Sequence, residues 1–282
     1  FQLLDSLFKN HDVTFVMAKY LDPDTMCNLY AISKDFHHAV NCRYQSFIKA
    51  SMQIWAPHGD KLFPWHFFRD LCVRDPIQNT IVHNLTEVRF VAGFRWLKMI
   101  TQRQKITDEI LYKLHLAGHP MPATMCNIVQ QMWFTNGISS NGNRIGLIHN
   151  QKYWREWQLF FAWFFIMKLD MHLNSPAHAP AHMQMRKMFL SHKSLASLGE
   201  LLKGCYTSLD IIRMKLRFGS NRPRQFQSQT WNVAGVQVQH FGRGIREAWG
   251  AGRTRALRIE QLILMECMRR RIWLNKAFYS VM

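Results

Sequence analysis

The 282-residue chain is poor in acidic side chains, with 18 Asp and Glu against 36 Lys and Arg. It also lacks a long apolar run. The longest, Leu159 to Met167, is far shorter than the roughly 20 residues that span a bilayer, and no segment resembles a signal peptide. We therefore expect a cytoplasmic or nuclear protein that has no membrane partner.

Motifs of catalysis and metal binding are also lacking. The 6 cysteines form no CxxC pair, and because they stand among apolar residues we expect buried, reduced thiols. The sequence contains no GxSxG motif, no HExxH motif and no paired-carboxylate pattern. Pro180 separates His178 from His182 and breaks the helix that would align them as metal ligands. We predict a protein that is not an enzyme, with no cofactor and no metal.

What the chain does contain is apolar and basic. Hydrophobic residues make up 48% and aromatic residues 13% of the sequence, which is enough for a real core. Apolar residues recur mostly at helical spacing, and no internal repeat is found, so we predict an all-α fold. The charge is uneven: residues 1–50 hold 5 basic and 5 acidic side chains, whereas residues 183–282 hold 18 and 5.

The N-terminal stretch predicts three short amphipathic helices. The first carries its apolar face from Val13 to Leu21. Asp22 is a good N-cap and Pro23 a good first residue for the second helix. Ser33 can cap a third helix, whose apolar face extends to Ile48. A unit of roughly forty residues rarely buries enough surface to fold alone, so the following chain or another protein must cover it.

The order of these residues resembles the F-box. The family's pattern is an apolar helix, a YLDP-like turn, a Leu-rich helix and a V-S-K-x-W/F segment. Here Tyr20-Leu21-Asp22-Pro23-Asp24 stands at the turn, followed by Leu29 and by Ile32-Ser33-Lys34 with Phe36. Segments 64–76, 95–111, 144–150 and 164–171 resemble the poorly characterised F-box proteins of filamentous fungi.

The resemblance implies that the motif binds Skp1, an adaptor that links it to a cullin ubiquitin ligase. The family's usual opening Leu-Pro is missing, since residues 7–11 contain no proline. This departure implies that the contact with Skp1 is weaker, or that the chain enters the first helix of the motif by a different path. Carried over by position, the residues at or beside the Skp1 contact are Val13, Val16, Met17, Tyr20, Leu21, Pro23, Met26, Leu29, Ile32 and Phe36.

Two domains are expected: an F-box-like module over residues 7–50, packed on a larger, irregular helical domain over 51–282 that binds the partner or substrate. In the second, we predict helices over 64–76, 86–104, a stretch capped by Thr107, 123–134, 151–171, 183–190, 195–203, 208–216 and 256–276. Residues 136–144 read as a loop. Residues 219–244 read as a long polar loop, with a small hairpin at 233–238 as the alternative.

Basic side chains gather in two late segments. They are Arg213, Arg217, Arg222 and Arg224, beside the aromatic Phe226 and Trp231, and Arg255, Arg258 and Arg269 in the last predicted helix. Such clusters bind single-stranded nucleic acid by charge and stacking, or hold an acidic or phosphorylated protein through bidentate contacts. A solvated basic surface explains them equally well.

Together these features predict a substrate-recognition adaptor that docks on Skp1 and presents a bound protein for ubiquitination. The alternative is a basic subunit that binds nucleic acid or a ribonucleoprotein, or that serves assembly only, with the F-box-like helices part of its structure.

Overall fold

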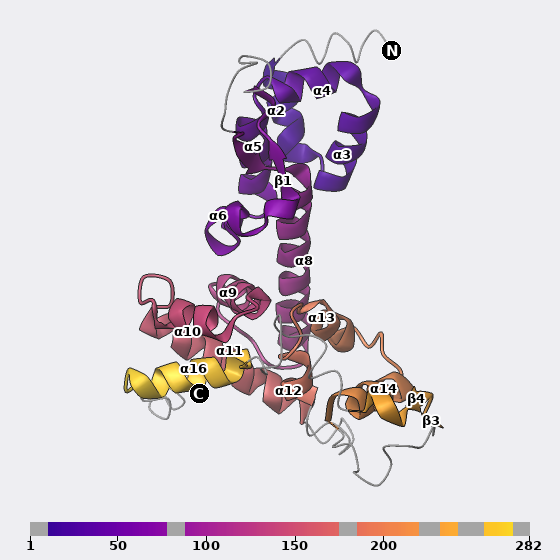
Figure 1. The fold of residues 1–282 in the computed structure, drawn as a ribbon, viewed down its shortest axis with the longest axis vertical. Helices are drawn as coiled ribbons and strands as arrows, with labels where there is room; N and C mark the ends of the chain where they lie inside the picture. The colour runs from indigo at the N-terminus through magenta and orange to yellow at the C-terminus, as the bar shows by residue number, and fades with distance from the viewer. Residues whose placement is uncertain (1–10, 78–87, 175–184, 220–231, 242–256, 273–282) are drawn as a thin grey trace. The chain divides into compact units, whose positions relative to one another are not determined.

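The structure, a computed structural model, describes residues 11–77, 88–174, 185–219, 232–241 and 257–272 (Figure 1). This part of the chain is mostly helical, with two antiparallel sheets of two strands each, which confirms the all-α prediction. The chain divides into two compact units, residues 1–105 and 106–282, at a point within helix α8 (Phe94–Leu116). The extent predicted for the F-box-like module, residues 7–50, stays a prediction.

The first unit begins with helices α2 (His11–Tyr20), α3 (Pro23–Ile32), α4 (Lys34–Asn41) and α5 (Tyr44–Trp55). The helix caps predicted at Asp22 and Ser33 are confirmed. The Asp22 carboxylate accepts hydrogen bonds from the backbone N–H groups of Asp24 and Thr25, and the Ser33 hydroxyl accepts one from that of Phe36. Because these caps satisfy N–H groups that lack helical partners, they fix where α3 and α4 begin.

The predicted third helix is interrupted. It ends at Asn41, and α5 starts at Tyr44 after a non-helical Arg43 (φ −140°, ψ 37°). No glycine or proline marks this break, so the local sequence does not require it. The apolar residues expected on one helix are nevertheless all buried, because the break lets α4 and α5 bury their faces separately: Phe36, Ala39, Val40, Tyr44, Phe47 and Ile48.

Phe47 of α5 lies at the centre of the first core and is 1% exposed. Its ring centroid lies 6.4 Å from that of Phe15 on α2, 5.9 Å from that of Phe36 on α4 and 6.0 Å from that of Phe94 at the start of α8. Helices α2 and α5 pack side by side (Figure 1). One side chain therefore joins three other elements of the unit.

Beyond α5 the first unit departs from the prediction. Helix α6 (Gly59–Leu62) is followed by 3-10 turns η1 (Trp65–Phe67) and η2 (Arg69–Leu71) and by strand β1 (Cys72–Arg74). Strand β2 (Phe90–Ala92) pairs antiparallel with β1, with Val73 opposite Val91. The helix predicted over 64–76 is wrong, and so is the start of the one predicted over 86–104. Pairing between segments this far apart in sequence overrides local helical spacing.

The second unit is organised around α11 (Glu156–Leu173), whose Leu159, Phe165 and Leu169 are fully buried. Helices α9 (Met125–Gly137), α12 (Met185–Phe189) and α16 (Ile259–Arg269) pack on it. The remaining elements are α10 (Asn141–His149), α13 (Ala196–Leu202), α14 (Ser208–Gly219), strands β3 (Asn232–Val233) and β4 (Val236–Gln237), and the 3-10 turn η5 (Val238–His240).

Two predictions for this unit are wrong, and for a third segment the alternative is confirmed. Thr107 caps no helix; it is fully buried within α8, which continues past it. The loop expected at 136–144 holds the end of α9 and the start of α10. Within 219–244, the described residues include the β3–β4 hairpin, which was the alternative to a long loop. Its turn places Ala234 (φ 50°) and Gly235 (φ 79°) in the left-handed region. Residues 220–231 and 242–244 of that loop lie outside the described part.

The sequence predicted buried thiols and no membrane-spanning segment. Of the six cysteines only Cys267 is buried, and burial raises its pKa to about 11. The expectation of buried thiols is wrong for Cys42 and Cys205, which are exposed. In the described segments, no helix has the length and apolar character needed to cross a bilayer.

The first testable prediction concerns Phe47. Truncation by Phe47→Ala removes the contacts with three other rings and leaves a cavity, so we expect a loss of about 3–5 kcal/mol in the free energy of unfolding. Ile54 lies on the same helix and is 51% exposed, so Ile54→Ala should cost about 0.5 kcal/mol or less. Urea-induced unfolding followed by circular dichroism measures both. Equal losses would contradict the central role of Phe47.

Candidate functional site

The residues predicted to contact Skp1 divide into three groups by exposure. Large parts of Val16, Tyr20 and Ile32 are exposed, at 49%, 79% and 81% of the residue surface. Val13, Met17, Leu21 and Leu29 are half-buried. Pro23, Met26 and Phe36 are buried.

The buried group belongs to the unit's own core. Met26 is 0% exposed, and the Ser51 hydroxyl of α5 donates to its sulfur at 3.9 Å. The Phe36 ring stands edge-on against that of Phe47. Neither side chain reaches a partner without opening the core, so any contact through this surface must be made by the exposed and half-buried groups.

Two of the three exposed residues lie at the ends of helices, and Val16 lies within α2. Tyr20 is the last residue of α2 and Ile32 the last of α3. Exposed apolar residues are common on any protein surface, and large contiguous patches of them mark interaction sites. These three residues lie within the segment that carries the sequence pattern, and Leu264, Met265 and Met268 of α16 are a second exposed apolar group.

The predicted basic residues are described only in part. Arg222, Arg224 and Arg255 lie outside the described residues. Of the other four, three contact groups of the chain itself. The Arg213 Nε donates to the Ala234 carbonyl at 2.9 Å, Arg258 lies 3.1 Å from a Glu260 carboxylate oxygen, and Arg269 binds Glu266 through two nitrogens. Arg217 is exposed on α14.

Glu266 is the centre of a charge network that holds α16 in place. Its side chain is 0% exposed, and the carboxylate contacts Arg269, Arg270 and, at 3.2 Å, His149 of α10. Arg270 also donates to the carbonyl groups of Trp154 and Ile148. Burial alone raises the pKa of Glu266, but hydrogen bonds from the two arginines outweigh it and hold that pKa below its ordinary value.

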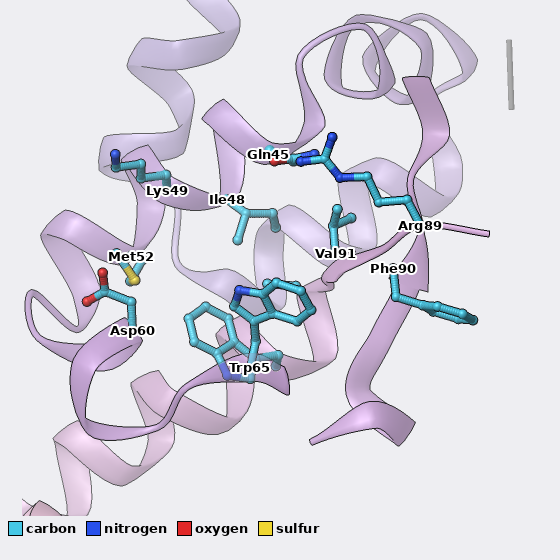
Figure 2. A pocket seen from close by; sticks show the side chains of 11 residues that line it. Gln45, Ile48, Lys49, Met52, Asp60, Trp65, Arg89, Phe90 and Val91 are labelled. Atoms are coloured by element: carbon cyan, nitrogen blue, oxygen red, sulfur yellow. The ribbon is translucent and has the colours of Figure 1, made fainter. Parts of the chain in front are cut away.

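A pocket of about 300 Å³ in the first unit was missed by the sequence reasoning (Figure 2). Its floor consists of the buried side chains Ile48, Met52, Val91 and Trp96, and Trp65 forms a wall. Figure 2 shows Ile48 and Val91 directed toward the space above Trp65. Lys49, Asp60 and Arg89 supply charged groups at the rim. The residues come from α5, α6, η1, β2 and α8, so no local motif announces them.

A second pocket of about 330 Å³ in the same unit has aromatic walls, Tyr30, Tyr44 and Phe94, and two arginines, Arg74 and Arg95. The Tyr44 hydroxyl accepts a hydrogen bond from the Phe94 backbone N–H, and burial raises the pKa of this tyrosine. The Tyr30 hydroxyl donates to the Asn41 side-chain oxygen at 2.7 Å. Both hydroxyls are therefore held in place.

Within the described ranges, no group of three or more His, Cys, Asp and Glu side chains is placed to hold a metal ion. His178 and His182 lie outside those ranges. Comparison with known proteins adds no functional assignment: no protein-family model matches the chain, and searches of curated proteins and of solved structures found no match.

The arginines at Glu266 give a second prediction. The side chain of Arg270 is 4% exposed, whereas that of Arg269 is 49% exposed. Arg270→Ala removes the buried cation that pairs with the Glu266 carboxylate and the donor to the carbonyl groups of Trp154 and Ile148, so we expect a loss of about 3–5 kcal/mol in stability. Arg269→Ala, the matched control, should cost about 1 kcal/mol or less. Thermal unfolding of the two variants checks this, and a larger loss for Arg269→Ala would contradict it.

A third prediction concerns pH. A carboxylate whose pKa is lower in the folded state stabilises the fold above its unfolded pKa of about 4.3, and that contribution is lost as the pH falls through the folded pKa. The wild type should therefore lose stability more steeply below about pH 4 than Glu266→Gln, whose side chain does not titrate. Urea midpoints measured between acidic and neutral pH test this. Parallel curves would show that Glu266 does not contribute.

Proposed function

We propose that this chain is a non-catalytic adaptor whose N-terminal helices dock on Skp1. Through Skp1 it would join a cullin-type ubiquitin ligase, in the cytoplasm or nucleus, and present a bound protein for ubiquitination. Two features support the proposal: the ordered residues from Tyr20 to Phe36, and the exposure of large apolar side chains among them.

The exposure of Tyr20 and Ile32 is the observation that carries the proposal. These side chains are 79% and 81% exposed, although the unit buries the neighbouring Met26 and Phe36 completely. Burying a large apolar side chain contributes roughly 1.5–3 kcal/mol, so a partner that covers both would gain substantial affinity. The structure thus directs the test to Tyr20 and Ile32 rather than to the half-buried Leu21 and Leu29, whose replacement would also disturb the unit itself.

The alternative, binding of nucleic acid through the late basic segments, finds less support. Three of the four described arginines in the predicted set contact Asp210, Glu260, Glu266 or a backbone carbonyl. Their charges are partly compensated within the chain, which lowers their value for phosphate binding. Arg222, Arg224 and Arg255 stay candidates for such a contact.

The fourth prediction tests Skp1 docking. Tyr20→Asp and Ile32→Asp each place a charge where an apolar contact is expected, so each should weaken binding to purified Skp1 at least about tenfold, or about 1.4 kcal/mol. Ile54→Asp is the matched control because Ile54 is an exposed apolar residue of the same unit outside the motif. Isothermal titration calorimetry measures the affinities.

The measured affinities distinguish support for the proposal from its rejection. Selective loss in Tyr20→Asp and Ile32→Asp supports the proposal, provided that both variants unfold at the wild-type midpoint. Absence of Skp1 binding by the wild type, or equal affinity of all variants, would overturn it. Co-purification from cell extract then separates two roles: Skp1 with a cullin supports ligase work, and Skp1 alone indicates an assembly subunit.

A further inference from the structure

The edge of β2 that faces away from β1 has no strand partner in the described part of the chain. The Asp75 N–H donates to the Arg89 carbonyl at 2.9 Å, which extends the β1–β2 ladder by one pair. In an antiparallel pair, backbone polar groups point alternately toward and away from the partner strand. Arg89 and Val91 therefore direct their N–H and C=O groups toward β1, and Phe90 and Ala92 direct theirs to the other edge.

The pocket in Figure 2 borders β2 along its length. Four consecutive residues, 89 to 92, line it, whereas no residue of β1 does. Successive side chains of a strand point to opposite faces of the sheet. Figure 2 shows the Arg89 and Val91 side chains on the pocket side and the Phe90 ring turned away from it, so Phe90 borders the pocket through its backbone. A chain that pairs with the outward N–H and C=O groups of Phe90 and Ala92 therefore passes next to residues that line the pocket.

The pocket is shaped for a bulky apolar side chain. Trp96 is 1% exposed, and its indole N–H donates to the Phe63 carbonyl at 3.0 Å, so this part of the floor is rigid. Ile48, Met52 and Val91 complete an apolar floor. A volume of about 300 Å³ is at the small end for ligand pockets, which suits one large side chain better than a cofactor.

The rim favours an acidic group. Lys49 is exposed, and no ion pair joins it to another described residue. The Arg89 side chain is 64% exposed, with Nε 3.8 Å from the buried Asp75 carboxylate. Figure 2 shows Lys49 and Arg89 at opposite ends of the pocket. Asp60 is the single acidic residue of the lining, so positive charge prevails there.

We propose that β2 accepts an extended peptide of a partner protein as a third strand. The peptide places one bulky apolar side chain in the pocket and an acidic residue beside Lys49 or Arg89. Backbone pairing with Phe90 and Ala92 holds the main chain, and the pocket selects the anchor, which is how strand addition divides affinity and specificity. Since β2 has only three residues, pairing alone is weak and the anchor is required. The site uses no residue of the proposed Skp1 contact.

The probe is a library of short random peptides displayed on phage and selected on the full chain at moderate salt. We expect enrichment of an apolar anchor with an acidic residue nearby. Enriched peptides, synthesised with a fluorophore, should bind Lys49→Glu at least about tenfold more weakly than wild type. Lys193→Glu changes the net charge equally at an exposed residue that does not line the pocket, and should have no effect.

Two further measurements test the strand geometry. Phe90→Pro removes the outward N–H but leaves the ladder with β1, so it should weaken binding about tenfold or more, whereas Phe90→Ala keeps that N–H and should bind nearly as wild type. N-methylation of the peptide, one residue at a time, should weaken binding to the wild type at alternate positions. This second measurement needs no variant and decides the question should Phe90→Pro fail to fold.

Three results would overturn the proposal. They are no enriched sequence, enriched peptides that bind Lys49→Glu as tightly as wild type, and insensitivity to N-methylation at every position. Tyr20→Asp should bind the selected peptide normally. Loss of peptide binding in that variant would show that the two surfaces are not separate.

Discussion

The first unit depends on the burial of one face of α5. Phe47 packs against rings from α2, α4 and α8, and it is the contact that these elements share. The adjacent turns of the same helix supply Ile48, Lys49 and Met52 to the pocket beside β2. A change that rotated α5 would therefore affect the N-terminal helices and the pocket together. The core is in this sense the scaffold that holds both candidate surfaces.

Position on the helices explains why some motif residues stay exposed. Met26 and Phe36 pack against α5, whereas Tyr20 and Ile32 stand at the ends of α2 and α3. Small units have a high ratio of surface to volume and cannot cover all their apolar residues. Part of the pattern thus folds the unit, and the rest stays exposed at its surface.

The sequence predicted those features of the fold that nearby residues determine, such as the starts of helices α3 and α4. Asp22, Pro23 and Ser33 set the helix starts because a cap satisfies N–H groups a few residues away. The break before Tyr44 and the strand at 90–92 were not predictable in this way, since distant packing and pairing fix them. The pocket residues come from five elements, and no spacing along the chain brings them together. The predicted contact list mixed core and surface residues for the same reason: periodicity finds an apolar face but not what covers it.

The charge distribution bears on how a partner would be chosen. The chain carries a formal charge of +18, yet the buried Glu266 and Glu260 are set against arginines inside the second unit. Some of the scarce acidic side chains thus stabilise the fold, and the excess positive charge is left to the surface. A diffuse positive surface speeds encounter with any acidic molecule but discriminates poorly among them. Selectivity must then come from shape, and the two surfaces that we propose for it are the exposed apolar side chains Tyr20 and Ile32 and the pocket beside β2.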